Sequence, residues 1–260
     1  MAFVLLAVLF ATAATAQDGQ LRRLNTGADA AGWEAVGRLN IGGTGFCTGA
    51  LIAPTLVLTA GHCLYDKKTG DRIDHTQVEF LAGWRNGRAS AYRGIRRAVV
   101  HPDYSYAGHV KSEGVRNDLA LLELERPIRD GKITPFETAA QPRKGAKVGV
   151  VSYGAGRSEA PSLQELCRVL AQQDGLLVTS CTVEFGSSGA PIFVIDNGRA
   201  QIVSVVSAKA EVEGKAVSLG TSLGAPLARL QAELVAQRDD ISPRISGGTR
   251  RDTGAKFIKP

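Results

Sequence analysis

The chain has 260 residues, of which 44% are hydrophobic and 22% are charged. This composition is ordinary for a globular protein and argues against wholesale disorder. The sequence has no Gly-X-Y period, heptad run or longer repeat, so we expect no collagen, coiled-coil or solenoid fold. The length suffices for one large domain or two small ones. The net charge is +6, but no known nucleic-acid-binding pattern accompanies it, so we expect no nucleic-acid partner.

Residues 1–16 have the features of a secretory signal peptide. Residues 3–10 are apolar, and the small residues 14–16 suit a cleavage site before Gln17. The apolar run is too short to cross a bilayer, and no other apolar stretch of the sequence reaches the roughly 18 residues that a crossing needs. No Lys or Arg lies at its start, so a buried N-terminal strand or helix is the alternative. We expect a secreted or periplasmic protein in which residues 17–32 form an N-terminal extension or a pro-segment.

Four cysteines, Cys47, Cys63, Cys167 and Cys181, would meet an oxidising compartment after secretion, where disulfides form. Three pairings of four cysteines can be drawn. Local pairing of Cys47 with Cys63 and of Cys167 with Cys181 would close two loops of about fifteen residues. Each disulfide would stabilise the fold by roughly 3 kcal/mol. A metal site is not favoured, because no Cys-x-x-Cys spacing occurs and the histidines are not clustered. We expect neither a metal nor another cofactor.

Short apolar runs between turn residues dominate the chain and predict strands. These runs lie at residues 46–52, 56–60, 78–82, 96–100, 119–124, 148–152, 176–179, 192–195 and 202–207. Many short strands and few helices are typical of an all-β sandwich or a pair of barrels.

Residues 125–144 contain three prolines and many charges, and they are the expected connection between two halves. Pro226 and the spacing of four apolar residues along one face predict a closing helix that ends near Gln237. These apolar residues are Leu227, Leu230, Leu234 and Val235. Residues 238–260 hold six Lys or Arg against three Asp. We expect them to form a flexible basic tail.

Three segments place polar residues beside apolar strands: residues 59–63 contain His62, residues 117–122 contain Asp118, and residues 186–191 contain Ser188. Each segment alone has an ordinary structural explanation, as a turn or a loop. Together they fit one reaction. A serine hydroxyl needs a base to attack a carbonyl, and histidine titrates near the operating pH. A buried carboxylate then orients the imidazole, and N–H donors stabilise the oxyanion.

The three segments resemble the histidine, aspartate and serine motifs of the trypsin-like (chymotrypsin-fold) serine proteases. The chain order His62, Asp118, Ser188 is the order of that family and differs from the order in subtilisins and α/β-hydrolases. The resemblance extends over about residues 33–237. It implies an all-β fold of two antiparallel six-stranded β-barrels packed with a cleft between them, plus a C-terminal helix.

The same resemblance implies how the site is assembled. Residues 33–140 would form the first barrel and carry the histidine and the aspartate. Residues 141–237 would form the second barrel, with the serine and the closing helix. The backbone N–H groups of Gly186 and Ser188 would form the oxyanion hole. Ser207 would support the aspartate and help to line the substrate site.

The cysteines and the specificity residues fit the family only in part. The resemblance implies that a Cys47–Cys63 disulfide ties the histidine loop to its neighbouring strand. A Cys167–Cys181 pair would close a local loop of the second barrel instead of forming the usual pocket disulfide. Thr182, six residues before the serine, would line the substrate-binding site, where an Asp would favour Arg or Lys substrates. Trypsin specificity is therefore not supported.

Two further positions depart from relatives within the family. Ser187 stands where animal trypsin-like enzymes have an Asp that pairs with a new amino terminus after zymogen cleavage, so we do not expect activation by that route. The pattern is closer to bacterial glutamyl-endopeptidase-like members. Val206, however, stands where glutamate-specific members carry a His, so glutamate preference is not supported either.

We therefore expect a secreted serine endopeptidase that acts as a monomer on protein or peptide substrates through an acyl-enzyme intermediate. The alternative is a catalytically silent binding protein on the same fold. A weaker alternative is a surface-adhering protein that uses the basic tail.

Overall fold

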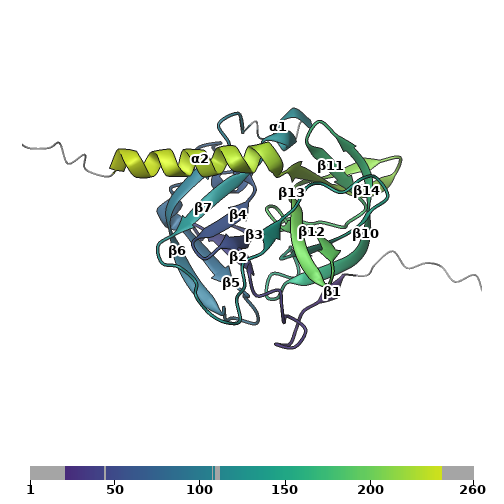
Figure 1. The fold of residues 1–260 in the computed structure, drawn as a ribbon, viewed down its shortest axis with the longest axis horizontal. Coiled ribbons are helices and arrows are strands. Elements are labelled where there is room, and N and C mark those ends of the chain that lie inside the picture. Colours follow the sequence, from purple (N-terminus) through teal and green to yellow (C-terminus); the bar gives the residue numbers. More distant parts are fainter. Residues whose placement is uncertain (1–20, 44, 107, 109–111, 242–260) are drawn as a thin grey trace, which may run out of the picture.

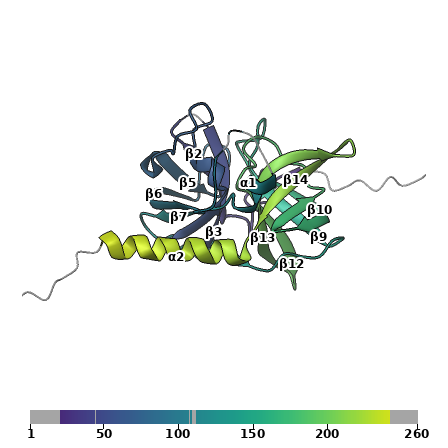
Figure 2. The ribbon, with the colours of Figure 1, turned by 90° about the horizontal axis from the view of Figure 1, so that it is seen from above.

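The computed structural model describes residues 21–43, 45–106, 108 and 112–241. Two β-barrels lie side by side, and one long helix starts beside the second barrel and runs along the first (Figures 1 and 2). The predicted fold class, two antiparallel six-stranded barrels with a C-terminal helix, is confirmed. The predicted signal peptide, residues 1–16, and the end of the predicted basic tail, residues 242–260, lie outside the described residues.

The first barrel closes in the strand order β2-β3-β4-β7-β6-β5, and every pair is antiparallel. Its strands are β2 (Val36–Ile41), β3 (Gly45–Ala53), β4 (Leu56–Thr59), β5 (Val78–Ala82), β6 (Ala91–Val100) and β7 (Ala120–Leu124). The described parts of its loops contain the short helices η1 (Gly61–Leu64), η2 (His75–Gln77) and α1 (Ser112–Arg116).

The second barrel closes in the order β9-β10-β11-β14-β13-β12. Its strands are β9 (Lys147–Ser152), β10 (Ser162–Gln173), β11 (Leu176–Thr179), β12 (Pro191–Asp196), β13 (Arg199–Val212) and β14 (Lys215–Ser222). A short strand, β8 (Glu137–Thr138), adds to β13 in parallel. The β12–β13 hairpin turns through Asn197 and Gly198, both at positive φ, which matches the twist of the flanking strands.

The described start of the chain belongs to the second barrel. Strand β1 (Arg22–Arg23) pairs with β10. Leu24 is fully buried, and its N–H donates to the carbonyl of Pro161 at 2.9 Å. Residues 21–24 fall within the segment 17–32, which was expected to be an extension or a pro-segment. In the folded chain, Arg22 and Arg23 pair with the second barrel while their side chains are exposed, and Leu24 is buried.

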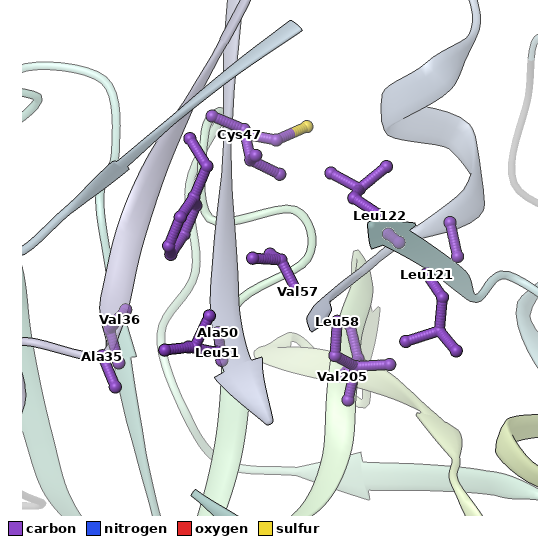
Figure 3. Packing of buried hydrophobic residues seen from close by; sticks show 14 of the residues in the cluster. Ala35, Val36, Cys47, Ala50, Leu51, Val57, Leu58, Leu121, Leu122 and Val205 are labelled. Carbon is purple, nitrogen blue, oxygen red and sulfur yellow. The ribbon is translucent and has the colours of Figure 1, made fainter. Parts of the chain in front are cut away.

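One apolar core fills the first barrel and continues across the junction between the barrels. Leu58 of β4 and Val205 of β13 belong to the same buried cluster (Figure 3). At the other side of the junction, the ring of Phe193 lies 5.0 Å from that of Trp33 and 4.8 Å from that of Phe136, measured between centroids. Burial of this shared surface fixes the two barrels against each other.

Helix α2 (Gly224–Ile241) packs against β6 and β7 of the first barrel. Leu227, Leu230 and Leu234 are buried, as the apolar spacing predicted, but Val235 of the same pattern is 53% exposed. The helix extends to Ile241, four residues beyond the predicted end near Gln237, because polar residues can continue a helix after its apolar pattern has ended. None of the described helices combines the length and the hydropathy that a bilayer crossing needs.

Candidate active site

His62 lies in η1, the turn that directly follows β4. The disulfide between Cys47 and Cys63 joins this turn to β3 and restricts the position of the histidine backbone. His62 lies close to both sulfurs, but the three residues do not form a metal site, because the disulfide occupies both thiols. The other disulfide, between Cys167 and Cys181, joins β10 to the loop that leads to Ser188.

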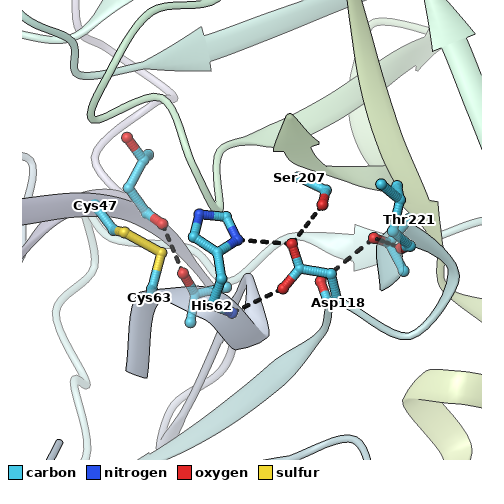
Figure 4. A network of polar contacts seen from close by, with 9 residues as sticks. Cys47, His62, Cys63, Asp118, Ser207 and Thr221 are labelled. Atoms are coloured by element: carbon cyan, nitrogen blue, oxygen red, sulfur yellow. Dashed lines mark hydrogen bonds and ion pairs between the residues drawn. A yellow bond between two sulfur atoms is a disulfide. The ribbon is translucent and has the colours of Figure 1, made fainter. Parts of the chain in front are cut away.

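Asp118 lies just before β7, and its side chain is only 3% exposed. The backbone N–H of His62 donates to Oδ1 at 2.7 Å, and Oδ2 lies 2.6 Å from His62 Nδ1. The hydroxyl of Ser207, on β13, also donates to Oδ2 (Figure 4). The hydroxyl of Thr221, on β14, donates to the Val115 carbonyl at 2.6 Å and lies 3.3 Å from the Asp118 carbonyl oxygen. Both barrels therefore hold the carboxylate, and the carboxylate holds the imidazole.

These contacts determine the state of the imidazole. A carboxylate oxygen only accepts hydrogen bonds at neutral pH, so Nδ1 of His62 carries the ring proton beside Asp118. In the neutral ring Nε2 is then an acceptor, the form that a general base requires. His62, Asp118 and Ser188 line one cavity of about 590 Å³. Among the described residues, no hydrogen bond joins the Ser188 hydroxyl to the imidazole, a contact that often forms only with substrate.

Thr48 of β3 fastens the turn that carries Ser188 to the first barrel. Its N–H donates to the Ser188 carbonyl at 2.8 Å, and its hydroxyl donates to the Gly186 carbonyl at 2.8 Å. The same hydroxyl accepts the N–H of Tyr153 at 3.1 Å. Thr48 is fully buried. Its only signal in the sequence is a polar residue inside an apolar strand, which by itself predicts no role in the site.

Two glycines allow this close approach. Gly189, at φ +78°, would bring an added Cβ within 2.3 Å of the Thr48 carbonyl oxygen. Gly186, at φ +94°, would bring one within 2.2 Å of the Phe46 ring. A side chain at either position would strain the backbone and push the turn away from the first barrel.

Ser188 lies in the same turn, between these two glycines. The N–H groups of Gly186 and Ser188 donate to no acceptor among the described residues. Two neighbouring amides without a protein partner are what a site for a developing oxyanion requires.

The cavity has an apolar part beside the serine, where Val183, Val206 and Ala208 contribute to its lining. Ser207, which was expected to line the substrate site, also lines this cavity. Thr182, the other expected substrate-binding residue, is not among the lining residues. It is exposed, and its N–H donates to the side chain of Gln164 at 2.7 Å. Val183 therefore lines the cavity, whereas Thr182, which was expected to line it, does not.

The mouth of the cavity carries an exposed aromatic ring and charges. Phe185 is 68% exposed. The ammonium of Lys67, from the first barrel, lies 5.5 Å from the centre of its ring, and that of Lys209, from β13, lies 5.4 Å from it. Lys209 also pairs with Glu184 at 3.1 Å. Residues of both barrels therefore meet around one ring at the opening.

The chain is similar to several curated proteases. Serine protease 23 of Rattus norvegicus is 30% identical over 165 residues, which cover 57% of this chain and 43% of that protein. Scolexin B of Heliothis virescens is 32% identical over 154 residues, covering 49% and 51%. Glutamyl endopeptidase of Bacillus licheniformis is 24% identical over 156 residues, covering 60% and 47%. The chain thus spans about half the length of these relatives.

A solved structure of a Glu endopeptidase in complex with MPD superposes with a TM-score of 0.67 at 18% identity, covering 85% of this chain and 99% of that one. This similarity shows a shared fold. The sequence model of the trypsin family matches residues 25–222, which include all three motifs found in the sequence. The chain therefore belongs to the trypsin family, and its likeness to the bacterial glutamyl endopeptidases is confirmed.

Proposed function

We propose that the chain is a secreted serine endopeptidase that hydrolyses peptide bonds through His62, Asp118 and Ser188 and an acyl-enzyme intermediate. The observation that carries this proposal is the 2.6 Å contact between Asp118 Oδ2 and His62 Nδ1, at the wall of the cavity that Ser188 also lines. Membership of the trypsin family supports the same reaction.

In this mechanism, Nε2 of His62 takes the proton of the Ser188 hydroxyl as Oγ attacks the peptide carbonyl. The imidazolium that forms is stabilised by the buried carboxylate of Asp118. His62 then gives the proton to the leaving amine, and the acyl group remains on Oγ. Water, deprotonated by the same nitrogen, attacks the ester and releases the second product.

The oxyanion of each tetrahedral intermediate would be bound by the N–H groups of Gly186 and Ser188. These amides have no acceptor among the described residues, so binding an oxyanion breaks no existing hydrogen bond. A preorganised pair of donors contributes strongly to rate, because loss of one typically costs about 10²- to 10³-fold.

Substrate would lie along the cavity, with its side chain before the scissile bond near Ser207. Val183, Val206 and Ala208 contribute to the lining there and carry no charge. An ionised substrate side chain would find no opposite charge on these three residues, so they favour an apolar side chain. The Thr182 position would act only indirectly, through the backbone beside Val183.

Secretion is supported by the signal-like residues 1–16 and by the two disulfides, which persist in oxidising compartments. The exterior and the periplasm both meet this condition. We propose that the protein acts there as a monomer on protein or peptide substrates.

The alternative is a binding protein on the same fold that has lost turnover. Digestion of a mixed peptide library, read by mass spectrometry, separates the two and gives the residue preference. The wild-type chain is expected to cleave library peptides, with apolar residues enriched before the scissile bond. The variant Ser188→Ala, which removes only the nucleophile, is expected to cleave none. A folded wild-type chain that cleaves no more than this variant would favour the binding protein.

A further inference from the structure

Ser187, next to the proposed nucleophile, uses every hydrogen-bonding position of its hydroxyl. The side chain is completely buried. The hydroxyl proton has two acceptors within reach, the Tyr153 carbonyl at 3.1 Å and the Ser152 hydroxyl oxygen at 3.3 Å. Oγ accepts from Arg157 Nη2 at 3.0 Å and from the N–H of Glu184 at 3.2 Å. One donor and two acceptor sites are all that a hydroxyl has, so these neighbours fix its position fully.

The guanidinium of Arg157 is itself held by two hydrogen bonds to Ser152 and by contact with Gly154. Nη1 donates to the Ser152 carbonyl at 2.5 Å, and Nη2 donates to the Ser152 hydroxyl at 2.9 Å. Its flat face lies against Gly154, where an added Cβ would come within 2.8 Å of the guanidinium. The planar group thus forms a rigid link from the end of β9 to Ser187.

This link reaches the turn that carries the proposed oxyanion donors. Ser187 lies directly between Gly186 and Ser188, whose amides have no acceptor among the described residues. The Ser187 N–H donates to the Glu184 carbonyl at 2.9 Å, so the residue is anchored through its backbone and its side chain. A rotation of the turn would break the bond from Arg157 and leave polar groups buried without partners, which is costly.

We propose that Arg157 is a positioning residue that acts through Ser187 to hold the Gly186–Ser188 turn in its oxyanion-binding conformation. This inference rests on the proposed function. The positive charge beside Ser187 is the guanidinium of Arg157, which belongs to the folded second barrel. The turn therefore needs no new amino terminus, of the kind that zymogen cleavage produces, to become ordered.

The test compares Arg157→Ala with the wild type, using a peptide ester substrate. We expect kcat to fall about 10- to 100-fold, which is part of the cost of losing one oxyanion donor outright. KM is expected to stay within about twofold, because the substrate pocket is not changed. Free methylguanidinium, added below denaturing concentration, should restore part of kcat, and Arg157→Lys should retain an intermediate value.

A matched control is Arg93→Ala. Arg93 is another partly buried arginine, but the guanidinium contacts found for it are only to backbone carbonyls of the first barrel, those of Tyr92, Arg126 and Pro127. Its kcat should be that of the wild type, with or without methylguanidinium. A peptide boronate, which mimics the tetrahedral intermediate, should bind Arg157→Ala more weakly by the same factor as the loss in kcat/KM.

The double variant Arg157→Ala with Ser187→Ala separates a positioning role from a general loss of stability. If Arg157 acts through Ser187, the effects of the two changes on kcat are not additive, and the double variant resembles Arg157→Ala alone. If Arg157→Ala does not fold, the same cycle is measured with Arg157→Lys in its place, combined with Ser187→Ala.

Additive effects, an unchanged kcat in folded Arg157→Ala, or a loss that methylguanidinium does not relieve would overturn the inference. The proposed function fails separately, on the wild-type chain itself, if that chain cleaves no peptide bond beyond the Ser188→Ala level or does not react at Ser188.

Discussion

At Asp118, hydrogen bonds from both barrels converge on a carboxylate that is nearly sealed from solvent. Changing Asp118→Asn keeps the size of the side chain but places an amide where the carboxylate accepts from His62. The imidazole would then take the wrong tautomer, with Nε2 protonated and unable to accept the proton of Ser188. We expect kcat to fall by about 10⁴-fold, measured on a peptide ester with equal amounts of folded protein.

Asp174→Asn is the matched control, because it makes the same chemical change at an exposed carboxylate. Asp174 pairs with Arg116 at 3.1 Å. Exposed pairs contribute little, so this variant should keep wild-type kcat and stability within error. If Asp118→Asn retained most of its kcat, the proposed role of the carboxylate would be wrong.

At the same scale, local motifs made His62, Asp118 and Ser188 recognisable in the sequence, because each lies in a short pattern that its chemistry requires. Thr48 and Arg157 carry no such pattern. Thr48 contacts Gly186, 138 positions away in the sequence, and Arg157 contacts Ser187, 30 positions away. Only the folded chain brings these partners together, so their roles could not be predicted from the sequence.

Among the elements, η1 depends on its disulfide for its position. Removing the Cys47–Cys63 bond by the double change to alanine frees a loop whose ends are 16 residues apart. We expect a loss of about 3 kcal/mol in the free energy of unfolding, measured by urea denaturation. The Cys167–Cys181 pair, with a separation of 14, should give a similar loss and serves as a comparison. Unchanged urea midpoints would show that neither loop is restrained in this way.

The residue that follows β6, His101, gives the fold a pH dependence. It is 5% exposed. Burial lowers the pKa of its imidazole, while Asp103 opposes this shift and Arg229 adds to it. The unfolded chain therefore binds a proton more readily than the folded chain. Stability should be complete above the ordinary pKa of about 6.5 and should decrease as the pH falls below it.

Thermal unfolding of His101→Gln tests this dependence, since glutamine does not titrate. The decrease in Tm between about pH 7.5 and pH 5 should be smaller in this variant than in the wild type. His75→Gln is the control, because the side chain of His75 is 38% exposed. Equal pH dependence in the wild type and His101→Gln would contradict the assigned cause.

Strands with continuous apolar runs, such as β4 and β7, were predicted within a residue or two. Strands β2, β10 and β14 were missed. In β10, exposed positions alternate poorly with buried ones, and the pairing with β9 shifts between Gln164 and Cys167. Leu166, inside this irregularity, adopts φ +68° and is 57% exposed. Such a bulge breaks the period of two on which strand prediction depends.

For the whole molecule, α2 links the end of the second barrel to the outside of the first. Leu230 is fully buried in the shared core, so Leu230→Ala should cost about 2–5 kcal/mol in the free energy of unfolding. Val235→Ala, at a position 53% exposed on the same helix, should cost much less. Equal urea midpoints for the two variants would show that α2 does not contribute its apolar face to the core.

The junction between the barrels was predicted only through the family resemblance. Composition and strand patterns indicated an all-β chain, but they gave no pairing between strands. Burial of one continuous cluster across the junction brings Asp118 of one barrel within reach of Ser207 of the other. The position of the candidate site is therefore a property of the packed pair of barrels.

The most direct test of the central claim is covalent labelling with a serine-directed phosphonate, followed by mass spectrometry of the intact protein and its peptides. A working triad predicts one adduct per folded chain, located on Ser188 and absent from Ser188→Ala. It also predicts much slower labelling of Asp118→Asn. Folded wild-type protein that stays unlabelled, or an adduct that persists in Ser188→Ala, would contradict the account.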